Sequence, residues 1–179
     1  RFMAIGHQRH YSYLYANAMS ILQQKDILGD VRHIRALWHR NSTKAGSPGA
    51  ESGKYDGWSL GRTIDPEDAK IDVAKYGYDS VEQLVRWRID KDKGGGLMVE
   101  LGSHQLDAIS LFLDKEQPKA VQGCGVNSYF KDGRGVFDHV FLIYEFPKSQ
   151  VVATYSSIGT NAFDGYGEQV MGTKGTLII

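Results

Sequence analysis

The most informative stretch of this sequence reads Gly94-Gly-Gly-Leu-Met-Val-Glu-Leu-Gly-Ser-His-Gln-Leu-Asp107, and its apolar character continues to Leu113. Successive side chains of an α-helix are rotated by about 100°. On that projection one half of the helix is apolar and the other half is polar. The apolar half holds Leu97, Met98, Leu101, Leu106, Ile109, Phe112 and Leu113; the polar half holds Glu100, Ser103, His104, Asp107 and Ser110. We therefore predict an amphipathic helix from about Leu97 to Leu113 that exposes a polar face.

Glu100 and His104 are four residues apart, so a helix places them one above the other on its polar face. A carboxylate beside an imidazole can orient the ring and stabilise its protonated form, and histidine titrates near neutral pH. The spacing fits proton transfer, but it also fits a solvated helix face with an incidental ion pair, or one metal ion shared by both groups. Spacing alone leaves these three interpretations open.

The flanking sequence predicts a β-rich domain. Apolar runs and alternation indicate strands over residues 2–5, 31–41, 119–130, 136–146, 151–158 and 167–172, and a last apolar run over 176–179. Ser12 is placed to cap one further helix, and residues 80–88 form another short one. Residues from about 42 to 70 are rich in Gly, Ser, Lys and Asp, and we interpret them as an irregular insertion.

The predicted strand 136–146 is apolar on both faces. One face holds Phe137, Phe141 and Ile143, and the other holds Val140, Leu142, Tyr144 and Phe146. A strand of this kind must be covered on both sides. The helices can cover one side, and either a second subunit or the folded-back insertion covers the other. We favour a subunit interface, and hence a homo-oligomer that forms through the sheet.

Composition excludes several classes of protein. The 179 residues suffice for one domain, and 21 basic residues balance 21 acidic ones, which gives no electrostatic reason to expect a nucleic-acid or anionic-membrane partner. The single cysteine, Cys124, cannot form an intrachain disulfide, which fits a reducing compartment and hence a cytoplasmic location, although many exported proteins also lack disulfides. No apolar run reaches the roughly 20 residues that a transmembrane helix needs. We therefore expect residues 1–179 to form a single domain without a membrane span.

Residues 94–107 resemble a hallmark segment of the Gfo/Idh/MocA family, which carries a glycine pair, an acidic residue, a histidine four positions later and an aspartate three after that. The segments Ile5–Tyr11, Leu28–Val31 and Gly172–Leu177 resemble further family segments in the same order. This resemblance implies the fold of that family's C-terminal domain, which is similar to the C-domain of glyceraldehyde-3-phosphate dehydrogenase. We therefore expect an α+β domain with an open, largely antiparallel or mixed sheet, helices on one face and subunit packing on the other.

The resemblance also implies a site. His104 matches the family's catalytic histidine and is expected to be the main general acid/base. Glu100 stands where the family usually has aspartate, one methylene shorter, and is expected to support it. Residues expected to face the substrate or cofactor are His7, Arg9, Arg40, Asn41, Arg88 and Asp107, and none of the site residues is expected to bind a metal. Asp164 and Tyr166 are expected to close a loop near this site.

Two family features are absent from the sequence. It lacks the glycine-rich turn that presents backbone amides to a dinucleotide pyrophosphate, and it lacks the Glu-Lys-Pro motif that supplies the usual catalytic lysine. The resemblance therefore implies the substrate-binding and oligomerisation domain of an oxidoreductase that acts on a sugar, polyol or sugar derivative with NAD or NADP. We expect the Rossmann domain, which binds the dinucleotide, to precede Arg1, and we expect this fragment to be inactive by itself.

Two other functions remain open at this stage. One is a non-redox relative in which Glu100, His104 and either His7 or His10 hold a metal for lyase or hydrolase chemistry on a keto-sugar. The other is a non-catalytic module that binds a sugar or promotes dimerisation.

Overall fold

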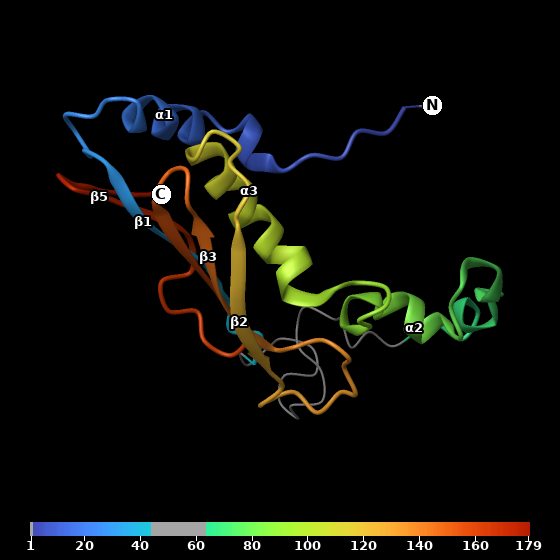
Figure 1. Cartoon of the computed structure of the whole chain (residues 1–179). Coiled ribbons are helices and arrows are strands. Elements are labelled where there is room, and N and C mark those ends of the chain that lie inside the picture. Colours follow the sequence, from blue (N-terminus) through green and yellow to red (C-terminus); the bar gives the residue numbers. More distant parts are fainter. Residues whose placement is uncertain (1, 44–63) are drawn as a thin grey trace.

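The computed structural model describes residues 2–43 and 64–179, which form an open six-stranded sheet with helices packed on one face (Figure 1). The strands, in sequence order, are β1 (Val31–His39), β2 (Ala120–Val126), β3 (His139–Phe146), β4 (Val151–Ile158), β5 (Tyr166–Gly172) and β6 (Thr176–Ile178). Their order across the sheet is β2-β3-β4-β1-β5-β6. The β1–β4 pair is parallel and the other four pairs are antiparallel. The expected mixed α+β fold is confirmed.

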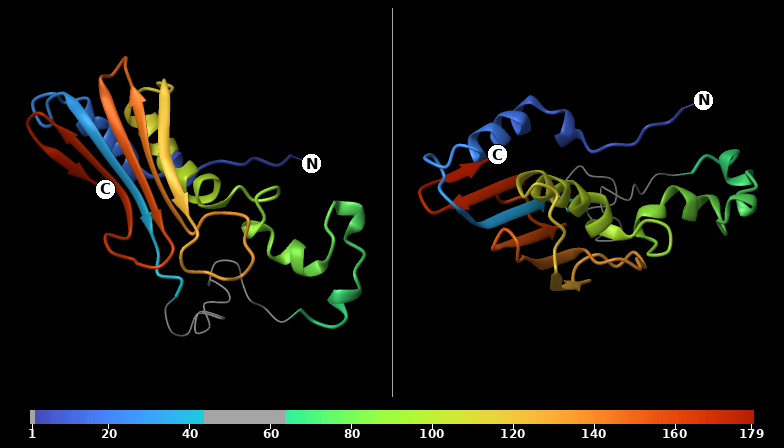
Figure 2. Two further views of the ribbon diagram at one scale, coloured as in Figure 1. Left: turned by 60° about the horizontal axis from the view of Figure 1, so that its bottom comes forward. Right: turned by 45° about the horizontal axis from the view of Figure 1, so that its top comes forward.

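Two helices cover one face of the sheet, as both views of Figure 2 show. They are α1 (Tyr13–Leu22) and α3 (Ser103–Phe112), and a π-helical turn, Met98–Gly102, leads directly into α3. Ile109 on α3 and Ile34, Ala153 and Val170 on the strands are fully buried between the two layers. The hydrophobic core therefore lies between α3 and the four central strands, as the apolar half of the predicted helix requires.

The opposite face of the sheet is open in the single chain. Phe141 and Ile143 on β3 are 41% and 43% exposed, whereas Tyr144 and Phe146 on the helix side are buried. This alternation confirms that β3 is apolar on both faces and that helices cover only one of them. Exposed Val152 on β4 adjoins the same open face, since it pairs with Glu145 of β3.

Residues 64–93 form an extension that projects away from the sheet (Figure 1). It contains α2 (Val81–Val85) and the 3₁₀ turns Asp68–Lys70, Ala74–Tyr76 and Trp87–Ile89. Ser80 caps α2, because its hydroxyl accepts a hydrogen bond from the backbone N–H of Gln83 at 3.1 Å. Of the insertion predicted over residues 42–70, only residues 42–43 and 64–70 are described, and residues 44–63 lie outside the described residues.

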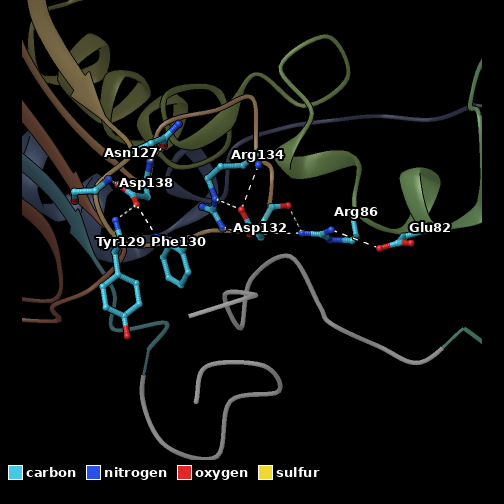
Figure 3. A network of polar contacts seen from close by, with 9 residues as sticks. Glu82, Arg86, Asn127, Tyr129, Phe130, Asp132, Arg134 and Asp138 are labelled. Atoms are coloured by element: carbon cyan, nitrogen blue, oxygen red, sulfur yellow. Dashed lines mark hydrogen bonds and ion pairs between the residues drawn. The ribbon is translucent and has the colours of Figure 1, made fainter. Parts of the chain in front are cut away.

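Two buried aspartates hold the β2–β3 connection, which runs from residue 127 to 138 (Figure 3). Asp138 accepts hydrogen bonds from the backbone N–H groups of residues 128, 129 and 130, at 3.2, 2.9 and 3.2 Å. Asp132 pairs with Arg134 inside the loop at 2.6 Å, and with Arg86 of the extension at 3.5 Å. The loop and the extension are thus tied together by buried charge.

Three local predictions need correction. Residues 2–7 form no strand, and the side chains of Phe2, Met3 and Ile5 are exposed, because this short apolar run has no neighbouring strand to pair with. Ser12 precedes α1, but its side chain makes no capping hydrogen bond; a 3₁₀ turn, Gln8–Tyr11, runs into the helix instead. The predicted strand 119–130 ends at Val126, where the connection held by Asp138 begins. Among the described residues, no helix is long and apolar enough to cross a membrane.

Candidate functional site

The glycine triplet determines the backbone path by which the chain enters the helix that carries His104. Gly95 and Gly96 have φ of 73° and 69°, left-handed values that residues with a Cβ rarely adopt. A Cβ on Gly96 would also lie 2.8 Å from the side chain of Val136. The following turn is π-helical, a feature that is frequent at functional sites. Gly102 lets this turn approach β4, since a Cβ there would lie 3.1 Å from the ring of Tyr155.

His104 lies on the first turn of α3 between two other rings. The centroid of the His7 ring is 4.9 Å from that of His104 in an edge-on arrangement, and the centroid of the Trp38 ring is 5.4 Å away. His104 Nδ1 is buried and makes no hydrogen bond within the described structure. Burial, together with the nearby charges of His7 and Arg9, lowers the pKa of His104 below 6.5, although Asp107 opposes this shift. His104 is therefore neutral at pH 7 and able to accept a proton.

Asp107 lies one turn further along α3 and joins two histidines of the N-terminal segment. Its Oδ1 is 2.7 Å from His10 Nε2 and 3.8 Å from His7 Nδ1. The other ring nitrogen of His7, Nε2, is 3.3 Å from the hydroxyl of Ser103. The structure thus brings Asp107, His7, His10 and Ser103 into one polar cluster around His104.

An aromatic surface adjoins His104. Trp38 on β1 stacks on Tyr166 on β5, with ring centroids 4.9 Å apart, and Tyr166 is 65% exposed. The guanidinium group of Arg40 lies 5.2 Å from the centre of the Trp38 ring. Trp38 was not among the predicted site residues. The sequence pointed to Trp38 in one way only: it lies two residues before Arg40, on the same face of a predicted strand.

Glu100 lies in the π-helical turn and pairs with a residue that precedes the glycine triplet. Its Oε2 accepts a hydrogen bond from Arg88 Nε at 3.0 Å. Both side chains line a narrow cavity of about 30 Å³ between the extension, the π-helical turn and the β2–β3 connection. Within the described part of the chain, no hydrogen bond joins Glu100 to His104.

Arg9 is buried, which corrects the expectation that it faces a substrate or cofactor. It is 4% exposed and its guanidinium group binds Glu168 Oε1 at 3.2 Å, the Tyr15 hydroxyl at 2.9 Å and Gln105 Oε1 at 2.6 Å. The physical reason is that a buried carboxylate, Glu168, requires a cationic partner. None of these three partners was among the predicted site residues.

Asn41 lies two residues after the end of β1 and is exposed. Its side-chain oxygen accepts a hydrogen bond from the backbone N–H of Thr43 at 3.0 Å, and its backbone forms an isolated bridge with Thr160. The side chain therefore stabilises a local turn. Over residues 2–43 and 64–179, no group of three or more His, Cys, Asp or Glu side chains is arranged so that it could hold a metal ion.

Similar solved structures support the same fold. The GenD2 protein of gentamicin A biosynthesis, crystallised with NAD, has a TM-score of 0.62 and 19% identity, covering 98% of this chain and 39% of that one. The myo-inositol 2-dehydrogenase of Lactobacillus plantarum gives 0.60 and 18%, covering 97% and 40%. The scyllo-inositol dehydrogenase of Lactobacillus casei, with bound NAD(H) and scyllo-inositol, gives 0.59 and 20%, covering 98% and 41%. The chain therefore spans about 40% of the length of these structures.

Family membership follows from the sequence match. No match is found among curated proteins. Residues 66–178 match the GFO/IDH/MocA C-terminal domain, a region that contains the glycine triplet, the π-helical turn, α3 and all strands except β1. Together with the fold, this match shows that the chain belongs to the Gfo/Idh/MocA family, as its C-terminal domain.

Proposed function

We propose that this chain is the substrate-binding domain of an oxidoreductase that transfers hydride between a sugar or polyol hydroxyl-bearing carbon and NAD or NADP. The observation that carries the proposal is the state of His104: a neutral, partly buried imidazole on the family's hallmark helix, flanked by the rings of His7 and Trp38. The similar structures include a scyllo-inositol dehydrogenase with NAD(H) and scyllo-inositol bound and an inositol dehydrogenase homolog in complex with NAD+, which supports this substrate class and cofactor.

His104 acts as the general base of the proposed reaction. As the hydroxyl carbon loses hydride, its oxygen loses a proton, and a neutral imidazole can take that proton. The nicotinamide supplies the hydride acceptor. The described residues offer no glycine-rich turn between a strand and a helix that could cradle its pyrophosphate, so this chain is not expected to hold the nucleotide alone.

The aromatic surface binds the sugar. One face of a pyranose or inositol ring carries C–H groups that pack on aromatic rings, and the exposed Tyr166, stacked on Trp38, presents such a ring beside His104. Arg40 at the same surface can donate hydrogen bonds to hydroxyl oxygens. These groups orient the substrate, whereas His104 moves the proton.

Two further surfaces require partners under this proposal. The N-terminal segment exposes Phe2, Met3, Ile5, Tyr11 and Tyr13, which would be covered by a nucleotide-binding domain of the same protein. The open sheet face exposes Phe141, Ile143 and Val152 and would pack on a second copy.

The test is a full-length protein assayed against a panel of sugars and polyols by nicotinamide absorbance. His104→Asn is expected to lower kcat by about 100-fold or more, because general-base catalysis contributes roughly that factor. The control is Asp26→Asn, since Asp26 lies in the exposed turn after α1, away from His104 and from the open face of the sheet. Binding of sugars without turnover would favour the non-catalytic module, and a stoichiometric transition metal lost in His104→Ala would favour the lyase or hydrolase.

A further inference from the structure

A buried polar network lies directly behind the candidate site. Its members are Arg9, Tyr15, Gln105 and Glu168, which are 4%, 8%, 0% and 1% exposed. They come from four different elements: the 3₁₀ turn before α1, α1 itself, α3 and β5. Burying this much polar surface is costly unless every group finds a partner, so the network needs an explanation.

Gln105 is the centre of this network. Its side-chain amide donates hydrogen bonds to the backbone oxygens of Leu37 at 3.0 Å and Gly167 at 3.2 Å. These two residues are paired across β1 and β5. Its side-chain oxygen accepts a hydrogen bond from Arg9 at 2.6 Å. One glutamine side chain therefore joins α3 to two neighbouring strands and to the N-terminal segment.

Each anchor of Gln105 adjoins a residue of the candidate site. Gln105 follows His104 on α3, Leu37 precedes Trp38 on β1, and Gly167 follows Tyr166 on β5. The rings of His104, Trp38 and Tyr166 are in contact in that order, with centroid separations of 5.4 and 4.9 Å. The glutamine thus fixes the backbone at the three points from which these rings project.

Arg9 links the network to the Trp38 ring. It lies 5.6 Å from the centre of the Trp38 ring and is held by Tyr15 and Glu168. Tyr15 in turn donates a hydrogen bond to Glu168 at 2.5 Å and stacks on Phe112 of α3. Burial raises the pKa of Glu168, an effect that Tyr15 and Arg9 oppose.

We propose that Gln105 and Arg9 are positioning residues, which set the rotation of α3 on β1 and β5 so that His104 meets the Trp38–Tyr166 surface in the geometry needed for proton transfer. This inference rests on the proposed function. It differs from the expected ligand contact of Arg9: the two residues touch no substrate and act through His104 and Trp38.

The first test follows the titration of His104 by NMR of the histidine rings in Gln105→Leu. The charged groups that face His104 are His7, Arg9 and Asp107, and they act on it at the distances that this packing sets. If α3 loses its anchor, the pKa of His104 is expected to rise toward 6.5. A folded Gln105→Leu protein in which His104 titrates as in the wild type would overturn the proposal.

Two controls separate positioning from loss of stability. Gln83→Leu removes a glutamine that also hydrogen-bonds at both ends, to Asp79 and Asp90, but lies in the extension. Ile109→Val weakens the packing of α3 by about 0.5–1.5 kcal/mol without touching the polar anchor. Neither control is expected to move the pKa of His104. If Ile109→Val moved it as far as Gln105→Leu does, positioning by the polar anchor would be refuted.

The second test measures turnover by the full-length enzyme. Gln105→Leu is expected to lower kcat by about 10- to 100-fold, since a misplaced catalytic group costs up to that factor, with KM changed by less than about two-fold. Gln105→Glu serves if the leucine variant does not fold, because it keeps the acceptor for Arg9 and loses the two donors to the strands. If the wild-type enzyme oxidised no sugar or polyol, the proposed function would fail, while the His104 titration would still decide whether Gln105 sets the position of α3.

Discussion

Replacing Asp138 with asparagine is expected to destabilise the domain by about 2–3 kcal/mol at pH 7. The carboxylate is 1% exposed and accepts three backbone N–H groups of the β2–β3 connection (Figure 3). It also binds His139 Nδ1 at 2.5 Å. A hydrogen bond to a charged group contributes about 1.5–3 kcal/mol. Asparagine keeps one oxygen acceptor but turns an NH₂ group toward the remaining donors. The expected loss therefore exceeds one such bond and falls short of the sum of all four.

The loss should depend on pH in a definite direction. Burial alone raises the pKa of Asp138, but the backbone donors, chiefly that of Tyr129, together with His139 outweigh it and hold this pKa below 3.8. A group with a depressed pKa in the folded state stabilises the protein above its unfolded-state pKa, and that contribution is lost as pH falls through the folded-state pKa. The difference between wild type and Asp138→Asn should therefore be constant from pH 7 to about pH 5 and shrink below about pH 4.

Urea denaturation followed by circular dichroism measures this difference as a shift in midpoint at constant slope. Asp26→Asn, in the exposed turn after α1, is the matched control and should change stability by less than about 0.5 kcal/mol. A loss below about 1 kcal/mol at pH 7 would refute the role given to the carboxylate. So would a loss that stays the same below pH 4, because the charge would then not be the source.

Three further outcomes are expected. The acidic limb of the kcat/KM profile of the full-length enzyme should lie below pH 6.5, because the pKa of His104 is lowered and only its neutral form accepts a proton; a limb above pH 7 would contradict this. Gly172→Ala should cost about 1–3 kcal/mol in thermal or urea unfolding, because its Cβ would lie 2.0 Å from the backbone oxygen of Leu28. Phe141→Lys combined with Ile143→Lys should convert oligomers to monomers in analytical ultracentrifugation, and unchanged oligomers would place the subunit interface elsewhere.

Local patterns predicted those parts of the fold that depend on near neighbours in the sequence. The amphipathic run after the glycine triplet became the π-helical turn and α3, and apolar alternation located β1, β3 and β4 within a few residues. The pairing of strands across the sheet could not be predicted from local sequence in the same way. β1 lies parallel to β4, which follows it by more than a hundred residues, and no local pattern distinguishes that partner from the other strands. The apolar run at 2–5 shows the same limit, since composition indicates a strand only where a partner strand exists.

In the candidate site, too, local spacing predicted some features, whereas contacts between residues distant in the sequence were missed. The hallmark spacing identified His104 and Asp107, which the structure places together with His7. The spacing did not indicate the partner of Glu100, which is Arg88, because Arg88 precedes the glycine triplet and only the folded chain brings it to the π-helical turn. Arg9 was predicted to face the substrate or cofactor, but it is buried. Its partners Gln105 and Glu168 are 96 and 159 residues away in the sequence, and only the folded chain brings them together.

The sequence pattern nevertheless indicates that Gln105 is unusual. It lies four residues after Leu101 and four before Ile109, so all three fall on one line along the helix, and all three are at most 3% exposed. A polar side chain in the middle of an apolar line must find buried partners, and an amide with both donors and an acceptor can join several elements at once. The polar residue on the wrong side of an amphipathic helix was therefore as informative as the polar residues on the expected side. His104 on the exposed side marks where the chemistry is proposed to occur, and its buried neighbour marks what holds it there.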